Sequence, residues 1–261
     1  MKKIMLALVL GLLIVSLSGC KTTTPEPKTV IFNDTVLEAR IRVIMNKPTG
    51  DILISEAETV ENLDLAEANP STPSARIIDI SALKYFTHLK GLNLSYQNVE
   101  DLSPLADLIE LEVLAYWGAG SVTNFSGLAN LTNMLDINLS NYNEGIGSNF
   151  TDADLAYLAD MPNLQLLTLQ GAKITDLSPL ANLSKLRKLN IDYSDISDLS
   201  PISEMTSLVE MDLRYTNVSD LSPLENLVNL QYLWLEGCPI TDYSPLVAIY
   251  PNLVTKDFSI E

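Results

Sequence analysis

The chain has 261 residues, of which 47% are hydrophobic and 19% are charged, so it has enough apolar material for a large core and is not a disordered chain. Its 33 acidic residues outnumber the 16 basic residues, and the formal net charge of −17 disfavours partners such as nucleic acid and anionic lipid. Such a surface would favour cationic partners or divalent ions.

The first 19 residues have the pattern of a secretory signal peptide. Lys2 and Lys3 precede the apolar run IMLALVLGLLIVSLS, which is shorter than the roughly 20 residues that a membrane-spanning helix needs. The run ends in LSGC at Cys20, which resembles the lipobox of bacterial lipoproteins. The resemblance implies cleavage before Cys20 and diacylation of its thiol. The body would then lie outside the cytoplasm, at the cell surface, and touch the membrane through this lipid alone. An uncleaved N-terminal anchor helix is the alternative.

Residues 20–30 are predicted to be the lipidated cysteine and a flexible, polar tether, because KTTTPEPKT is rich in threonine, lysine and proline. Residues 31–58 are predicted to form an N-terminal helical cap, which a solenoid needs over its first coil. A helix capped by Asn33 or Asp34 would carry an apolar face made of Leu37, Ile41, Ile44 and Met45. Ser55 and Glu58 suggest a capping box for a second helix.

Residues 59–261 repeat the pattern L-x-x-L-x-L-x-x-x-x-[IV]-x-D-L-S-P-L-x-x-L. The clearest copies start at Leu89, Leu111, Met134, Leu164, Leu186, Leu208 and Leu230, and the last four are spaced by 22 residues. This period is typical of leucine-rich repeats. We therefore expect a solenoid of the α/β class with eight to nine coils, a parallel concave sheet and short helical turns on the convex side.

Aspartate recurs immediately before the Leu-Ser-Pro-Leu segment of the coils. The side chain at this position can accept hydrogen bonds from the backbone N–H groups that open a short helical turn, and proline suits the first turn. The residues concerned are Asp79, Asp101, Asp176, Asp198, Asp220 and Asp242. A row of calcium ligands is the alternative, although the D-x-D clustering of a dedicated calcium loop is absent from the repeats.

Two features carry a resemblance to a known family. The block VLEARIRVIMNKPTGDI resembles the helical cap of internalin-like bacterial surface proteins, and the 22-residue repeats ending in [IV]-x-D-[IL]-S-P-L resemble the same family. The resemblance spans about residues 31–258 and implies a protein-binding concave face. After Leu253 the chain stops at KDFSIE, so Lys256 and Asp257 are expected to protect the edge of the last strand.

Two further sites admit alternatives. The repeat that starts at Met134 is stretched by the segment from Asn141 to Asn149, which is either a functional loop or a tolerated insertion. TDADLAYLADM is then expected to form a true convex-side helix.

Cys238 is the remaining cysteine once Cys20 is lipidated, so no intrachain disulfide is expected. Because its column holds Ser194 and Thr216, we interpret Cys238 as a small residue at the edge of the core.

Outward-pointing strand positions supply the candidate ligand site. At these positions, large aromatic residues occur in three consecutive repeats near the C-terminus, together with charged residues. Trp117 belongs to a weaker second cluster with Tyr96. Protein-binding surfaces are enriched in tyrosine, tryptophan and arginine. The predicted ligand-binding residues are Tyr193, Tyr215, Tyr232, Trp234, Arg214, Asp192, Glu236 and Trp117. Packing of these rings across neighbouring strands is the structural alternative.

The pattern favours a lipid-anchored binding protein whose concave face takes a protein or peptide, for adhesion or for envelope scaffolding. A module for cell-wall or surface glycans, stacked on tyrosine and tryptophan, is the second hypothesis. An enzyme is disfavoured, because the sequence lacks a glycine-rich phosphate loop and the H-E-x-x-H and G-x-S-x-G motifs. Asp192 and Asp212 could form a carboxylate pair, but an open solvated face is not expected to raise their pKa values. No cofactor, metal or nucleic-acid partner is predicted.

Overall fold

The computed structural model describes residues 28–67, 75–141 and 147–260. These residues contain three α-helices, α1 (Thr35–Ile44), α2 (Ile54–Ala57) and α3 (Asp152–Leu155). They also contain nine strands, which are β1 (Asn62–Asp64), β2 (Gly91–Asn93), β3 (Val113–Ala115), β4 (Asp136–Asn138), β5 (Leu166–Thr168), β6 (Lys188–Asn190), β7 (Glu210–Asp212), β8 (Tyr232–Trp234) and β9 (Thr255–Lys256).

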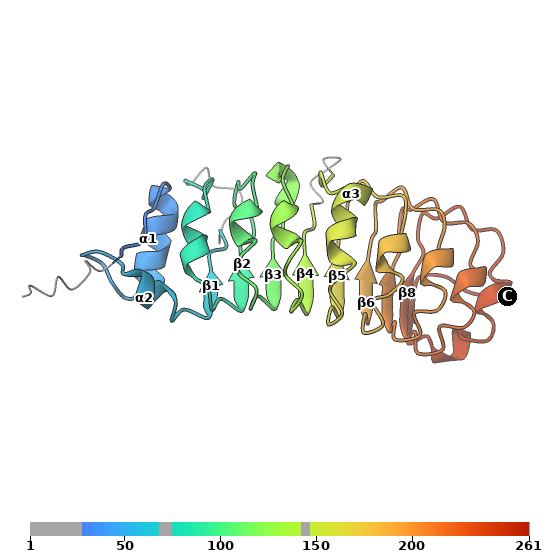
Figure 1. Cartoon of the computed structure of the whole chain (residues 1–261). Coiled ribbons are helices and arrows are strands. Elements are labelled where there is room, and N and C mark those ends of the chain that lie inside the picture. The colour runs from blue at the N-terminus through green and yellow to red at the C-terminus, as the bar shows by residue number, and fades with distance from the viewer. Residues whose placement is uncertain (1–27, 68–74, 142–146, 261) are drawn as a thin grey trace, which may run out of the picture.

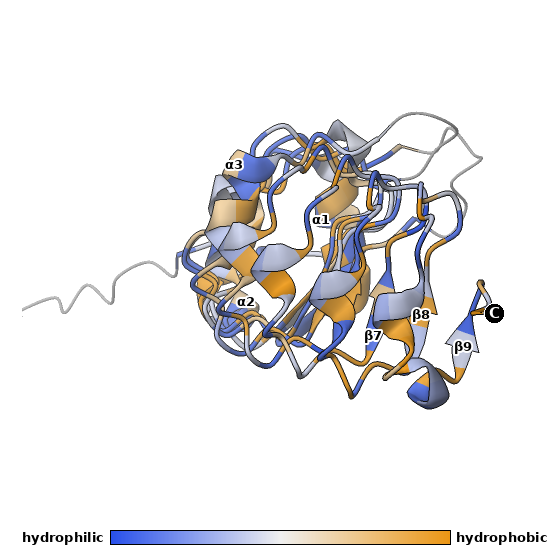
Figure 2. Ribbon diagram, turned by 90° about the vertical axis from the view of Figure 1, so that its right-hand side faces the viewer, coloured by the Kyte–Doolittle hydropathy of each residue, from blue (hydrophilic) through white to orange (hydrophobic). Residues whose placement is uncertain are grey.

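The nine strands of the described residues form one parallel sheet in the order of the chain, from β1 to β9. Equivalent positions of consecutive coils pair in register, as Leu189 of β6 does with Met211 of β7. Figure 1 shows the coils following one another from α1 at one end to the C-terminus at the other. Viewed along this axis, β7, β8 and β9 lie on one side of the coils and α3 lies on the opposite side (Figure 2).

Short 3-10 helices occupy the convex side of most coils, usually at the Ser-Pro-Leu segment. In the described residues they are Ser81–Tyr85, Ser103–Leu105, Ala119–Ser121, Ser126–Leu128, Ala156–Leu158, Ser178–Leu180, Ser200–Ile202, Ser222–Leu224, Ser244–Leu246 and Tyr250–Asn252. The aspartate that precedes each segment accepts the N–H of the serine two residues later, as Asp220 does from Ser222 at 2.9 Å. The predicted turn chemistry is confirmed at all six aspartates.

The repeated apolar positions fill the interior of the coils. Leu167, Leu169, Ile174 and Leu177 of one coil are fully buried, and their equivalents in neighbouring coils continue the same core. A single coil could not bury this much apolar surface alone, so stacking is what stabilises the fold. The predicted leucine-rich-repeat solenoid is therefore confirmed.

The N-terminal end differs from the prediction in two details. Asp34 caps α1 by accepting the N–H groups of Val36 and Leu37, as expected. The apolar face was predicted too wide, because Leu37 and Ile41 are buried whereas Ile44 is 41% exposed. The capping box at Ser55 and Glu58 is also wrong.

The second helix begins at Ile54, one residue before the predicted cap. The carboxylate of Glu56 accepts the N–H of Leu53 at 2.8 Å, and Lys47 holds the same carboxylate from the preceding turn. Glu56 therefore fills the role that the sequence pattern assigned to Glu58.

The stretched repeat contains less helix than expected. The segment after Thr151 forms one α-helical turn, α3, and continues as the 3-10 helix Ala156–Leu158. Thr151 donates both its N–H and its hydroxyl to Asp154, which fixes the start of the turn. The two ends of the preceding segment are joined, because Asn141 donates to the carbonyl of Gly147, and Asn149 is held to an earlier coil by donating to the carbonyl of Gly120.

The last strand is covered more fully than the sequence suggests. The carboxylate of Asp257 accepts the N–H groups of Leu235 and Glu236, and the Lys256 ammonium group lies 4.5 Å from the ring centroid of Tyr250. The ring of Phe258 stacks on that of Tyr243 at 5.3 Å. Asp257 thus binds the preceding coil and Lys256 binds its own, while the ring of Phe258 packs against the core.

The predicted leader and lipid site fall outside the described residues, which begin at Lys28. In the part of the chain that the structure describes, no helix has the length and apolar character needed to cross a bilayer.

Candidate functional site

The residue that follows the concave face, at position eight of the repeat, adopts an unusual backbone conformation in six coils, whereas Asn141 at the same position does not. Glycine occupies it in three coils, at Gly118, Gly171 and Gly237, with φ between 75° and 79°. Tyrosine occupies it in three others, where φ is 61° at Tyr96, 57° at Tyr193 and 56° at Tyr215. A non-glycine residue in this left-handed region costs on the order of 1 kcal/mol. The alignment of repeats did not reveal this requirement.

Two of these tyrosines form one surface. The rings of Tyr193 and Tyr215 stack with centroids 4.6 Å apart and an interplanar angle of 18°. The ring of Tyr215 covers Gly237, where a Cβ atom would lie 2.4 Å from it. The Tyr215 hydroxyl donates to Oε1 of Glu236 at 2.8 Å, and this bond raises the pKa of Tyr215. The rim of these coils is therefore lined by two parallel rings and a carboxylate.

A second aromatic pair lies on β8. Tyr232 and Trp234 have centroids 6.3 Å apart and an interplanar angle of 20°, and both side chains are partly exposed. The register places Asp212 of β7 beside Trp234. We call Tyr193, Tyr215, Tyr232 and Trp234 the aromatic patch. The structure thus brings the four predicted rings to neighbouring coils in two stacked pairs.

Arg214 is anchored beside this patch by a bidentate ion pair. Its Nε and NH2 atoms donate to the two carboxylate oxygens of Asp212 at 2.9 and 2.6 Å. These bonds raise the pKa of Arg214 above its ordinary value, and the charges of Asp192 and Asp257 make smaller contributions in the same direction. Because one charge cancels the other, Arg214 presents a fixed, partly exposed planar group, and the acidic groups around it leave the site negative.

Asp192 differs most from its prediction. Its side chain was expected on an open face, but the residue is fully buried. Gln170 donates to Oδ2 at 2.8 Å, whereas Oδ1 has no hydrogen-bond partner among the described residues. Burial, together with the charge of Asp212, raises the pKa of Asp192 to about 6, against the hydrogen bond from Gln170 and the charge of Arg214. The expectation that this face leaves carboxyl pKa values unchanged is therefore wrong for Asp192.

A second buried oxygen shares this environment. Ser140 Oγ also lacks a partner among the described residues, and it belongs to the same column as Gln170 and Asp192, two coils away from the latter. Buried polar groups are nearly always hydrogen-bonded in native proteins. The column of concave residues under the rim therefore contains two buried oxygen atoms, Ser140 Oγ and Asp192 Oδ1, that could still accept a hydrogen bond. The interior of the same coils is apolar.

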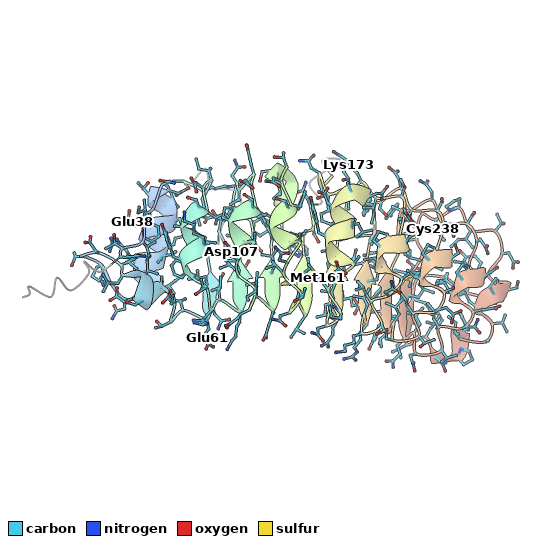
Figure 3. All side chains as sticks on the ribbon, viewed as in Figure 1. Glu38, Glu61, Asp107, Met161, Lys173 and Cys238 are labelled. Carbon is cyan, nitrogen blue, oxygen red and sulfur yellow. The ribbon has the colours of Figure 1, made fainter. Side chains whose placement is uncertain are left out.

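Two predicted residues lie apart from the patch. Trp117 follows β3, five strands from β8, which corresponds to about 24 Å along the sheet. It is 48% exposed and belongs to a separate surface. Cys238 is half-buried beneath the rim near the C-terminal end (Figure 3), where its thiol contacts Thr216 Oγ1 at 3.3 Å and donates to the carbonyl of Leu213. Its contacts agree with a residue at the edge of the core.

One concave feature was not anticipated. The first three strands form a hollow whose floor consists of small or polar side chains, and its lining includes Asp64, Gly91, Asn93, Val113 and Ala115. Small residues here remove the side chains that fill the same positions on β6 to β8. The column Gly91, Val113 in the sequence carried this signal. Among the described residues, no group of three or more histidine, cysteine or acidic side chains is placed to hold a metal ion.

Comparisons with known proteins agree with this architecture. Residues 162–204 and 206–248, the four most regular coils, match the family model described as leucine rich repeats in two copies. No curated protein matches the chain in sequence.

Similar structures include internalin C2 of Listeria monocytogenes, with 26% identity over 88% of this chain and 96% of that protein and a TM-score of 0.73. Internalin F of the same organism has 26% identity over 89% of this chain and 78% of that chain, with a TM-score of 0.57. A leucine-rich-repeat protein of Leptospira interrogans has 21% identity over 78% of this chain and 56% of that protein, with a TM-score of 0.58, and shows a similar fold. The chain thus has a leucine-rich-repeat fold, and its structure is similar to those of the two Listeria internalins.

Proposed function

We propose that the chain is a lipid-anchored, extracytoplasmic binding protein that presents the aromatic patch to a protein or peptide. It is a non-catalytic module, with residues 1–19 as leader, 20–30 as tether, 31–58 as cap and 59–261 as the binding solenoid. Solenoids of this kind commonly bind partners on their concave surface. The lipid on Cys20 would keep the module at the cell surface.

The observation that carries the proposal is the left-handed backbone of Tyr193 and Tyr215. Glycine would satisfy this position without strain, as it does at Gly171 and Gly237 of the flanking coils. Two bulky rings instead occupy adjacent coils at a cost in stability, and strain of this kind gathers at ligand sites. Tyrosine is also a preferred anchor residue in protein interfaces, since its large rigid ring loses little entropy on binding.

The charge near the patch supports a partner that carries basic side chains. Asp192, Asp212, Glu236 and Asp257 are acidic, and Arg214 is already paired with Asp212. A lysine or arginine of the partner could lie over the exposed tyrosine rings as a cation–π contact. The acidic surface would also speed the encounter with a basic partner.

The test uses the immobilised full chain to capture material from envelope and host-surface extracts. The parent is compared with the double variant Tyr193→Gly/Tyr215→Gly, which removes both rings and relieves the backbone. Tyr96→Gly is the matched control, because Tyr96 has the same conformation on a distant coil. We expect the double variant alone to lose the captured protein, and a photo-crosslinker at Tyr232 to attach to it. Equal capture by all three proteins would refute the proposal.

A glycan ligand is the second candidate, favoured by the flat, parallel rings of Tyr232 and Trp234. It predicts capture of cell-wall material that survives protease treatment of the extract and that depends on Trp234. The lipid anchor is tested separately. Cys20→Ala should release the chain from the membrane into the aqueous phase, and a variant that stays in the detergent phase would contradict lipidation at Cys20.

A further inference from the structure

The N-terminal helix carries an apolar surface that the repeats do not use. Val43 is 80% exposed, the largest value among the exposed large hydrophobic side chains of the described residues, and Ile44 beside it is 41% exposed. Leu37 and Ile41 on the opposite side of α1 are fully buried. The helix is thus apolar towards the core and also towards the outside.

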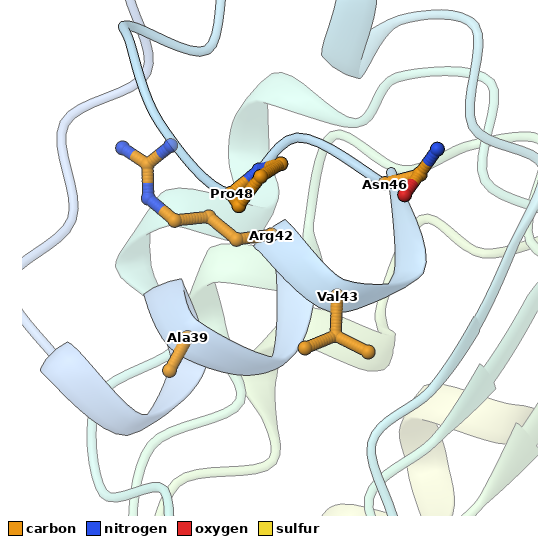
Figure 4. A pocket seen from close by; sticks show the side chains of 5 residues that line it. All are labelled: Ala39, Arg42, Val43, Asn46 and Pro48. Atoms are coloured by element: carbon orange, nitrogen blue, oxygen red, sulfur yellow. The ribbon is translucent and has the colours of Figure 1, made fainter.

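This outer surface forms a crest between two open grooves. One groove is lined by Ala39, Arg42, Val43, Asn46 and Pro48, and the other by Val36, Ala39, Arg40, Val43, Ile44 and Asp64. Ala39 and Val43 line both grooves, so they stand between them. We call Val36, Ala39, Val43 and Ile44 the α1 crest. Figure 4 shows Ala39 and Val43 projecting from the helix while the Arg42 guanidinium group turns towards the segment of Pro48.

The charged side chains of α1 are drawn away from the crest. Arg42 donates to Glu38 at 2.9 Å and to the carbonyl of Gly50 at 2.8 Å. Arg40 donates to the carbonyl of Ala66 and to the carboxylate of Glu67. Arg40 and Arg42 border the grooves, but both are bonded to carbonyl or carboxylate oxygens, so the crest between the grooves consists of aliphatic side chains in a chain with 33 acidic and 16 basic residues. Such patches usually mark contact with a protein or a membrane.

The position of the chain entry indicates which contact this is. The carbonyl of Lys28 accepts the N–H of Ile54, and Thr29 pairs with Leu53, so the tether joins the molecule at the end occupied by α1 and α2 (Figure 1). Seven residues separate Cys20 from Lys28, and the eight residue steps between the two span at most about 29 Å in an extended chain. A lipid on Cys20 therefore holds this end of the solenoid close to the bilayer.

We infer that the α1 crest rests on the membrane surface and sets the solenoid upright on it. This inference rests on the lipid anchor of the proposed function and extends it, because the lipid alone was expected to touch the membrane. A few aliphatic side chains are too small for a dimer interface of about 800 Å² per partner, and the net charge opposes a second copy. They suffice to orient a protein that a lipid already confines to the surface. The acidic chain selects a neutral, zwitterionic lipid surface.

The experiment uses the full lipidated chain on phosphatidylcholine vesicles that contain a nitroxide-labelled lipid. Val43→Cys and Val247→Cys are each made with Cys238→Ser and labelled with an environment-sensitive fluorophore. Val247 is the matched control, since it is 59% exposed and follows the 3-10 helix Ser244–Leu246 between β8 and β9, the strands farthest from α1 in the sheet order. We expect a blue-shifted and quenched emission at position 43 and an unchanged emission at position 247.

Flotation of the vesicles separates the failures. Protein that floats without quenching at position 43 overturns the crest contact and leaves the anchor standing. A blue shift without quenching that grows with protein density means that a second copy covers the crest, which also overturns it. Protein that does not float overturns both the anchor and the contact. In a further test, Val43→Asp should remove the quenching of a label at Ile44, whereas Val247→Asp should not.

Discussion

Aspartate side chains on the convex turns and on the concave side of the last coils differ in exposure, hydrogen bonding and pKa. On the convex side, Asp198, Asp220 and Asp242 are exposed, and the serine hydrogen bonds hold their pKa values below the usual range. On the concave side, Asp192 is buried, keeps an unpartnered oxygen, and has a pKa raised to about 6. Aspartate thus has its hydrogen bonds satisfied by neighbouring serines on the convex side, whereas the burial of Asp192 on the concave side costs free energy.

Backbone conformation follows the same division. Proline and serine of the convex segment adopt the helical turn that their chemistry favours, whereas Tyr193 and Tyr215 adopt a conformation that glycine suits better. Where a repeat keeps the locally favourable residue, the reason is structural. Where Tyr193 and Tyr215 depart from that residue at a cost, the proposed ligand site supplies a reason. Four substitutions can break or sharpen this comparison.

The largest effect is expected for the interior that both regions share. Leu189→Asp places a charge inside a coil where the side chain is fully buried, and it should lower the free energy of unfolding by more than about 4 kcal/mol. Leu166→Asp is the matched control, because Leu166 lies on the outer face of β5 and is 38% exposed. Circular dichroism during thermal unfolding measures both. Similar melting of the two variants would contradict the assigned inward and outward faces.

Asp192→Asn should stabilise the protein at pH 8. The folded pKa of about 6 lies above the unfolded value of 3.8, so the folded state binds the proton more tightly and loses stability as the pH rises from 4 through 6. The amide removes the charge but adds a buried N–H₂ donor, so the expected net gain is about 1 to 2 kcal/mol.

Urea unfolding at pH 5 and pH 8 tests the sign of this effect. The parent should lose more stability between these pH values than Asp192→Asn. Asp195→Asn serves as control, since it removes one negative charge from an exposed residue of the same coil. If Asp195→Asn flattens the pH dependence equally, general charge repulsion is the cause and burial of Asp192 is not.

At Tyr215, the glycine variant should be more stable than the alanine variant, which is the reverse of the usual order. At its left-handed φ of 56°, Tyr215→Gly should be more stable than Tyr215→Ala by about 1 kcal/mol, since alanine keeps the strain and loses the ring. Tyr232 on β8 is the comparison, because glycine in an ordinary strand is less stable than alanine. Chemical denaturation of the four variants decides. The same order at both positions would remove the argument from strain.

The smallest effect is expected on the convex side. Asp220→Ala removes the hydrogen bonds from the Ser222 side chain and backbone that lower the pKa of Asp220, so a slight fall in melting temperature is expected at pH 7. The lowered folded pKa means that this contribution is present above the unfolded pKa and is lost as the pH falls through the folded value. The difference between Asp220→Ala and the parent should therefore vanish in strong acid. A difference that persists there would point to another cause.

Much of the fold could be predicted because the repeats average out local ambiguity. Leu189, Leu167 and the aspartates before Leu-Ser-Pro each recur in equivalent coils, so their roles could be compared within one chain. Residues that occur once lacked this support. Ile44 was assigned by helical spacing alone and Ser55 by the S-x-x-E pattern, and the structure exposes Ile44 and starts α2 at Ile54.

The sequence predicted which aromatic residues of the candidate site lie together, but not the burial or the backbone conformation of the residues there. The outward positions correctly gathered Tyr193, Tyr215, Tyr232 and Trp234 on neighbouring coils. Burial of Asp192 depends on the packing of Gln170 and other residues from adjacent coils, which strand alternation does not describe. The left-handed position could have been found, since Gly118, Gly171 and Gly237 recur in one column. The tyrosines of the same column hid the pattern, because tyrosine does not indicate a positive φ as glycine does.

The end of the sheet shows how a repeating ladder becomes finite. Within the sheet the N–H of Leu213 binds the carbonyl of Trp234 in the next coil, and the N–H of Tyr215 binds that of Glu236. One coil later, the N–H of Leu235, which corresponds to that of Leu213, binds the side chain of Asp257, and the neighbouring N–H of Glu236 binds the same carboxylate. A carboxylate thus stands in for the backbone of a further strand and saturates two donors that would otherwise template growth. Asp257 therefore lets β9 remain two residues long, because its side chain binds the donors that lie beyond the paired residues of β8.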